Sequence, residues 1–275
     1  MKASIETTIQ DPAYADPICT DGIERLRIRV HPSNRWNPPT LIYLPGIHGD
    51  WTLIGAFREG LQRRACFVDM TYPRTTRWSL QDYATAIEEG LRGHGIQGGW
   101  LLGESFGSQV LWELAARKRF RISGLILAGG FVRYPYPALV AWARGILPHV
   151  SHRMLLRLLP AYVMYAKFRH SGSPISIQGA RDFVVRRNHL DKEAILHRLR
   201  LIEANDPREV ARTTPFPVHH LYGAIDPIVP WPPVGGWLRK NCPSLRGSRR
   251  VLASDHTILA TAAESSVEQV CQWIA

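Results

Sequence analysis

The chain has 275 residues, of which 45% are hydrophobic and 9% aromatic, a composition typical of a folded chain with a full core and not of a disordered one. Its formal net charge is +11, but it contains no run of about 18 apolar residues, so we predict no membrane-spanning helix. The four cysteines, Cys19, Cys66, Cys242 and Cys271, form no CxxC pair and no Cys/His cluster, so we expect a reduced compartment and no structural zinc.

The first 22 residues are polar and irregular. They lack the apolar stretch of a secretory signal, and together with the cysteine pattern this favours a cytoplasmic protein. Alternating apolar and charged residues then predict a half-exposed strand over 23–30.

From residue 40 to residue 131 the chain alternates strands and helices. Continuous apolar runs are typical of strands buried on both faces of a parallel sheet. They predict strands over 40–44, 65–69, 100–103 and 122–128. Helices are expected between them at about 51–63, from the N-cap Ser79 to residue 92, and at about 106–118. This β-α-β-α order predicts an α/β fold with a mostly parallel sheet flanked by helices.

The alternation stops at residue 132. Helical periodicity predicts helices near 137–146, 151–167, 176–187, 191–204 and 206–212, with no convincing strand among them. Strands resume at 218–222 and 249–253, and helices follow them at about 231–240 and 258–273. We therefore predict a core made of residues 1–131 and 214–275, interrupted by an all-helical insertion, the cap, at 132–213.

The positive charge is concentrated in this cap. Residues 132–213 hold 14 Lys and Arg against 6 Asp and Glu, whereas the rest of the chain holds 20 against 17. Three interpretations stay open: solvated faces of helices, a membrane-surface face formed by Arg153, Arg157, Lys167 and Arg169 beside a leucine-rich stretch, or a nucleic-acid surface. No nucleic-acid-binding motif accompanies the charge, so we expect no nucleic-acid partner.

One stretch carries the pattern of a catalytic nucleophile. Gly103-Glu104-Ser105-Phe106-Gly107 follows an apolar strand and opens a helix, and Gly-x-Ser-x-Gly in that setting is typical of a nucleophile elbow. A tight turn lifts the serine hydroxyl above the sheet, and small flanking residues let the strand and the helix pass closely. The alternative is a structural strand–helix turn with a buried or capping serine.

A serine hydroxyl needs a base to accept its proton and a carboxylate to orient that base. Asp226 lies in a loop after the strand at 218–222, and His256 follows the last predicted strand. One helix and one strand separate them, which returns both loops to the same sheet edge. The chain order serine, acid, histidine is the one used on the α/β-hydrolase fold.

On these motifs the chain resembles the α/β-hydrolase superfamily, specifically its capped, esterase-like members. The elbow, the acid loop Tyr222-Gly-x-x-Asp226-x-x-Val-Pro, the pair Asp255-His256 and the loop Leu44-Pro-Gly-Ile-His-Gly49 carry the resemblance. It implies Ser105 as nucleophile, Asp226 as orienting acid and His256 as general base. It also implies an oxyanion hole formed by the backbone N–H groups of Ile47 and Phe106.

Four further residues, three in these loops and one at the end of the strand over 65–69, have a structural and a functional interpretation. We expect His48 to shape the oxyanion loop, with a substrate hydrogen bond as the alternative. Glu104 is expected behind the elbow, with modulation of His256 as the alternative. Asp255 is expected to cap the final helix, and Asp69 to be structural, while a triad acid is the alternative for both. Pro45-Gly46 stands where many relatives carry His-Gly, and Glu104 where a histidine is frequent.

The combination predicts a serine hydrolase that cleaves a carboxylic ester with a hydrophobic acyl or alcohol group through an acyl-enzyme. Its partner would be a small-molecule ester or thioester, with membrane-surface contact through the basic cap as a further possibility. No metal and no cofactor are expected, because no His, Asp and Glu group has ligand spacing. An acyltransferase or thioesterase with the same triad is one alternative. A non-catalytic ligand receptor on the same fold is another.

Overall fold

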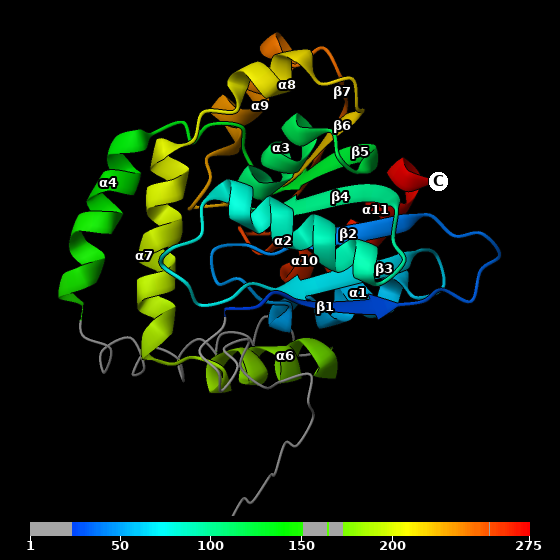
Figure 1. Ribbon diagram of the computed structural model, residues 1–275, viewed down its shortest axis with the longest axis horizontal. Helices are drawn as coiled ribbons and strands as arrows, with labels where there is room; N and C mark the ends of the chain where they lie inside the picture. Colours follow the sequence, from blue (N-terminus) through cyan, green and yellow to red (C-terminus); the bar gives the residue numbers. More distant parts are fainter. Residues whose placement is uncertain (1–23, 151–163, 165–172, 253) are drawn as a thin grey trace, which may run out of the picture.

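The computed structural model describes residues 24–150, 164, 173–252 and 254–275 (Figure 1). Their centre is a seven-stranded sheet with the order β1-β3-β2-β4-β5-β6-β7. Neighbouring strands run parallel except at one edge, where β1 pairs antiparallel with β3. The strands are β1 (Arg27–His31), β2 (Thr40–Leu44), β3 (Cys66–Thr71), β4 (Gly98–Glu104), β5 (Arg121–Ala128), β6 (Val218–Gly223) and β7 (Leu245–Val251). The mostly parallel sheet flanked by helices that the sequence predicts is confirmed.

Helices cover both faces of the sheet and form two cores. One core packs α2 (Leu80–Gly93), α3 (Gly107–Arg117) and α9 (Trp231–Asn241) against the strands. The other packs α1 (Gly55–Leu61), α10 (Ile258–Thr261) and α11 (Ala263–Ile274) against the opposite face. Successive residues of β2 alternate between the two: Ile42 and Leu44 join the first core, and Leu41 and Tyr43 join the second. This two-sided burial explains the continuous apolar runs of the central strands.

The ends of several elements differ from the sequence expectations. The first helix begins as a short 3-10 turn, η2 (Thr52–Ile54), before α1. The final helix is not continuous: it breaks at Ala262, whose φ of −140° and ψ of 51° are not helical. The break lets α11 run along α1, where Gly60 lies against Val267. The last strand begins at Leu245, four positions before the expected start at Arg249.

Every described element between β5 and β6 is a helix. These are α4 (Pro137–Ile146), η3 (Leu147–His149), α6 (Pro174–Val185), α7 (His189–Ala204) and α8 (Arg208–Thr213). Helices α4 and α7 lie side by side at one end of the molecule (Figure 1), where Arg144 and Glu203 form an ion pair at 2.9 Å. The division into core and cap at residues 132 and 213 stays a prediction.

Some expectations for the cap lie outside the described residues. The helix expected over 151–167 does so apart from Met164, and so do all four basic residues proposed for a membrane-surface face. Within the parts of the chain that the structure describes, none of the helices has the length and apolar character that crossing a bilayer requires.

The strand order creates a topological switch point at the carboxyl end of the sheet. The chain passes from β2 to β3 on one side and then returns to form β4 on the other side of β2. The loops that leave β2 and β4 therefore diverge at a topological switch point, where open α/β sheets bind their ligands. Leu44 pairs with Gly103 in this register, which sets the loop after β2 beside Ser105.

Candidate active site

The turn between β4 and α3 has the strained geometry that the sequence pattern predicts. Ser105 has a φ of 50°, a left-handed conformation that is uncommon for residues other than glycine. A Cβ on Gly103 would lie 2.9 Å from the backbone of Gly107, and a Cβ on Gly107 would lie 2.1 Å from the carbonyl oxygen of Leu44. Both positions therefore need glycine, because strand and helix cross there without room for a side chain.

The acid loop and the histidine loop are joined through their backbones. The N–H of Ala224 donates to the carbonyl of Val251 at 2.9 Å, and the N–H of Ile225 donates to the carbonyl of Ser254 at 3.1 Å. A Cβ on Gly223 would lie 2.2 Å from the carbonyl oxygen of Asp255, so only glycine permits this approach. These contacts set the positions of the side chains that follow in each loop.

Ser105, His256 and Asp226 form one hydrogen-bonded chain. The Ser105 hydroxyl donates to Nε2 of His256 at 2.8 Å, and Nδ1 of His256 donates to Oδ2 of Asp226 at 2.8 Å. The second oxygen of Asp226 accepts from the backbone N–H groups of Ile228 at 2.8 Å and Val229 at 2.9 Å. A carboxylate held in this way fixes the imidazole so that Nε2 faces the hydroxyl and can accept its proton.

The loop after β2 lies against the nucleophile. A Cβ on Gly46 would be 3.6 Å from Cβ of Ser105. The loop is a tight turn in which the N–H of Gly49 donates to the carbonyl of Gly46 at 2.9 Å, with Ile47 inside it. Phe106 stands at the N-terminus of α3, where backbone N–H groups favour negative charge. Phe106 thus follows Ser105 directly, and Ile47 lies in the loop whose Gly46 approaches Ser105.

His48 is a packing residue of this loop. Its ring meets the ring of Phe183 on α6 edge to face, with centroids 4.8 Å apart. His48 as a whole stays exposed to solvent. These contacts agree with the expected role of shaping the loop.

Glu104 is half-buried behind the elbow, as expected, and its partner is Tyr43. The phenol of Tyr43, on the adjacent strand β2, donates a hydrogen bond to Oε2 of Glu104. Burial raises the pKa of Glu104, and the bond from Tyr43 and the proximity of His256 oppose that shift. The sequence holds one signal for this pair, since a tyrosine buried in an apolar strand requires a hydrogen-bond partner for its hydroxyl.

The other two acidic residues hold structural contacts. Asp255 accepts hydrogen bonds from the N–H and hydroxyl of Thr257, both at 2.9 Å, and so braces the turn just before α10 instead of capping the long helix that was expected. Asp69 is fully buried and forms ion pairs with Arg29 at 2.8 Å and Arg58 at 3.3 Å. Both contacts agree with structural roles for these residues.

A network of buried ion pairs joins the core to the helices that follow β5. Arg187 pairs with Asp50, at the end of the loop after β2, and also with Asp191 at 3.1 Å. Arg74 reaches Asp191 at 2.9 Å from the core side. All four side chains are less than a tenth exposed. The partners are far apart in the sequence, so no local pattern indicates the network.

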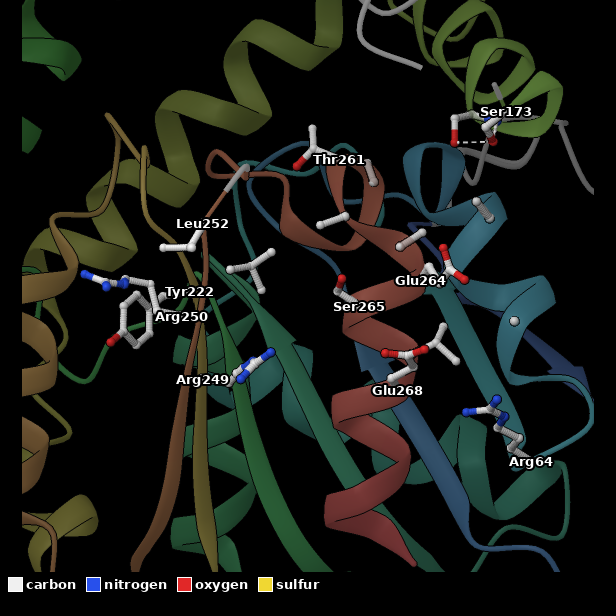
Figure 2. Close-up of a pocket in the computed structure, with 18 of the residues that line it drawn as sticks. Arg64, Ser173, Tyr222, Arg249, Arg250, Leu252, Thr261, Glu264, Ser265 and Glu268 are labelled. Carbon is white, nitrogen blue, oxygen red and sulfur yellow. Dashed lines mark hydrogen bonds between the residues drawn. The ribbon is translucent and has the colours of Figure 1, made fainter. Parts of the chain in front are cut away.

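A large concave surface lies away from Ser105. This groove, of about 1240 Å³, runs between β7 and α11, and its lining includes none of Ser105, Asp226 and His256. Its lining includes Arg249 on β7 and Glu264 and Glu268 on α11, all labelled in Figure 2. Its charged walls do not fit a hydrophobic acyl group. Among the described residues, no group of His, Cys, Asp and Glu has the arrangement of a metal site.

Comparison with known proteins places this architecture. No protein-family model and no curated protein matches the sequence. An α/β hydrolase from a Medee basin deep-sea metagenome library shares 11% identity at a TM-score of 0.70, covering 91% of this chain and 94% of that one. The chain has the α/β-hydrolase fold.

Two further structures with this architecture have narrower descriptions. An enol-lactonase from Burkholderia xenovorans LB400 is 19% identical at a TM-score of 0.72, covering 91% of this chain and 96% of its own. An esterase from Exiguobacterium antarcticum is 15% identical at a TM-score of 0.72, covering 94% and 97%. At these identities the likeness concerns the α/β-hydrolase fold, and the activity of this chain is a separate question.

Proposed function

We propose that this protein is a serine hydrolase that cleaves a carboxylic ester bearing a hydrophobic acyl or alcohol group. The observation that carries the proposal is the continuous hydrogen-bonded chain from Ser105 through His256 to Asp226, with both links at 2.8 Å. A structural serine in a tight turn needs neither a histidine on its hydroxyl nor a buried carboxylate on that histidine. The α/β-hydrolase fold, shared with esterases and a lactonase, agrees with this chemistry.

The proposed reaction has two acyl-transfer steps. His256 accepts the proton of Ser105 as its Oγ attacks the ester carbonyl, and then gives that proton to the leaving alcohol as the carbon–oxygen bond breaks. A water molecule, deprotonated by the same imidazole, attacks the acyl-enzyme, and Ser105 regains its proton as the acid leaves. Asp226 stabilises the imidazolium in both steps.

Two backbone N–H groups would hold the negative oxygen of each tetrahedral intermediate. These are the N–H of Phe106, at the start of α3, and the N–H of Ile47, in the loop after β2. Each donor of this kind is typically worth about 10²–10³ in rate, because it meets a charge that exists only in the transition state. Phe106 follows Ser105 in the chain and Ile47 lies in the loop whose Gly46 approaches Ser105, which supports this assignment.

Exposed apolar side chains support a hydrophobic substrate. Ile228 in the acid loop is 53% exposed, and Trp142 on α4 is 66% exposed. The start of α4 is tied to the acid loop, because the hydroxyl of Tyr134 donates to the carbonyl of Ile228 at 2.5 Å. An acyl or alcohol chain that covers such apolar surface gains about 25 cal/mol per Å² in binding.

A substrate series tests the function. Nitrophenyl esters and acyl-thioesters of increasing chain length should be hydrolysed, with kcat/KM rising with chain length, and Ser105→Ala should abolish turnover of each. Ser265→Ala is the matched control, since Ser265 lies on the exposed side of α11. The proposal fails if Ser105→Ala hydrolyses these esters at the rate of the unchanged protein. Faster reaction of thioesters, or transfer to an added alcohol, would point to the thioesterase or acyltransferase alternatives.

A further inference from the structure

Arg198 on α7 is an unusual residue for a protein interior. Its side chain is 1% exposed, although arginine is almost never fully buried unless an opposite charge accompanies it. Within the described part of the chain, no carboxylate lies within ion-pair distance of its guanidinium, whereas the neighbouring Arg187 has two. Burying a cation without an opposite charge opposes folding, which points to a role for Arg198 other than stability.

The guanidinium of Arg198 is directed at the loop beside the nucleophile. Nη1 donates to the carbonyl oxygen of Ile47 at 2.7 Å, and Nη2 donates to the carbonyl oxygen of Pro73 at 3.0 Å. Nε approaches the hydroxyl of Tyr83 at 3.4 Å. Its cationic donors are therefore used on backbone carbonyls, and one of these belongs to a residue proposed for the oxyanion hole.

The bond to Ile47 holds the central peptide of a turn. The turn runs from Gly46 to Gly49 and is closed by its own backbone hydrogen bond at 2.9 Å. Arg198 therefore fixes the Ile47 carbonyl from outside the turn. Through the Ile47 backbone this bond limits movement of the loop that carries the Ile47 N–H.

Gly49 provides the space for this contact. A Cβ at this position would lie 2.6 Å from Nη1 of Arg198, and Gly49 itself has a φ of 75°. The loop thus closes over the guanidinium without a side chain between them.

Arg198 also contacts the residues that pack around the second donor. Its guanidinium lies 5.7 Å from the centre of the Tyr72 ring. Tyr72 and Tyr83 pack edge to face against each other at 4.9 Å, and both rings pack against Phe106, at 6.2 and 5.8 Å. One side chain from α7 therefore contacts the Ile47 loop directly and the aromatic cluster that supports Phe106.

We propose that Arg198 is a positioning residue that keeps the oxyanion hole formed. Through Arg198, the packing of α7 against the core affects catalysis at Ser105. The inference rests on the function proposed above. Arg198 acts through the Ile47 peptide, so its loss leaves the Ser105–His256–Asp226 chain in place but weakens the stabilisation of the oxyanion. The step affected is the attack of Oγ on the carbonyl carbon, in which the carbonyl oxygen takes the negative charge.

Three variants and two ligands test this. A trifluoromethyl ketone of matched chain length adds reversibly to Ser105 and leaves an oxyanion in the hole. KM for a nitrophenyl ester whose acylation is the slow step, as the absence of a nitrophenol burst establishes, reports ground-state binding. Arg198→Met should lower kcat by about 10- to 100-fold and reduce the affinity for the ketone by a similar factor. These losses are smaller than the loss expected when an oxyanion donor itself is removed. KM should change by less than about twofold. Arg198→Lys, which keeps the charge and can reach one carbonyl, should lie between Met and the unchanged protein.

The control is Arg200→Met, which removes an exposed cation from the same helix and should change neither kcat nor the affinity of the ketone. Circular dichroism establishes which variants fold. If Arg198→Met does not fold, the kcat and ketone affinity of Arg198→Lys decide the test. A folded Arg198 variant with unchanged kcat and ketone affinity overturns the inference and leaves the proposed function intact. If the protein without substitutions shows no esterase activity and does not bind the ketone, the proposed function itself is overturned.

Discussion

Gly129 lies directly against His256. A Cβ at Gly129 would be 3.1 Å from the carbonyl oxygen of His256 and 3.4 Å from Nδ1, the nitrogen that donates to Asp226. Gly129 follows β5 and has a φ of 55°, a conformation that costs other residues roughly 1–2 kcal/mol. The backbone at Gly129, just after β5, therefore packs directly against the imidazole, with no side chain between them.

Gly129→Ala is expected to shift the His256 ring by a few tenths of an ångström. Misplacement of this size weakens the hydrogen bond to Ser105, so kcat for a nitrophenyl ester should fall by at least about 10-fold. The free energy of unfolding should fall by about 1 kcal/mol, from backbone strain. Gly236→Ala in α9 is the control, because a Cβ there meets nothing within 4 Å, and it should stabilise the helix slightly without changing kcat. Unchanged kcat in Gly129→Ala would show that this contact does not position the imidazole.

Glu104 makes stability depend on pH. Burial raises its pKa above the usual 4.5, so the folded protein holds the Glu104 proton more tightly than the unfolded chain does. The stability linked to that proton is fully present below about pH 4.5 and is lost as pH rises through the folded pKa. As pH rises from about 4.5 through the folded pKa, the free energy of unfolding of the unchanged protein, measured in urea, should fall relative to that of Glu104→Gln. Glu268→Gln on the exposed face of α11 should show no such difference. Parallel pH profiles for Glu104→Gln and the unchanged protein would contradict the prediction.

Asp50 has the opposite pH dependence. Burial raises its pKa, but the guanidiniums of Arg187 and Arg186 outweigh burial and hold the pKa well below its usual range. The stabilisation is therefore present above the unfolded pKa of about 3.8 and is lost as pH falls through the folded pKa. Asp50→Asn leaves Arg187 with Asp191 as its remaining carboxylate, so the free energy of unfolding at pH 7 should fall by about 1–3 kcal/mol.

A surface pair provides the comparison for Asp50→Asn. Asp206 pairs with Arg208 at 2.6 Å, but the Asp206 side chain is 37% exposed. Asp206→Asn should change the free energy of unfolding far less, because solvent screens the pair. Equal effects of the two substitutions would show that the contact between Asp50 and Arg187 does not contribute to holding α6 and α7 on the core.

Local patterns in the sequence predict the central part of this fold well and its edge poorly. The strands at 40–44 and 122–128 are buried on both faces, so their apolar runs correspond closely to β2 and β5. The edge strand β7 begins four residues earlier than expected, because Arg246 and Ser248 are exposed and lack an apolar signal. What makes this segment a strand is its backbone pairing with β6, which no residue pattern records.

The candidate site divides in the same way. Ser105, Asp226 and His256 each follow a strand in an ordered motif, so the sequence predicts their meeting. The contacts of Arg198 and Tyr43 depend on how distant segments pack, and they were not predicted. A signal for Arg198 does exist: it occupies the buried face of α7 together with Ala194 and Ile202, where an arginine is out of place. Its partner in the loop after β2 follows only from the three-dimensional structure.

The most direct test of the account is the reaction of Ser105 with a fluorophosphonate probe. The serine oxygen would displace fluoride from phosphorus, His256 would take the proton, and intact-protein mass would rise by the mass of one phosphonyl group. The account predicts a single label on Ser105, lost in Ser105→Ala and slowed in His256→Ala. No label on the unchanged protein, or equal labelling of the folded Ser105→Ala variant, would contradict it.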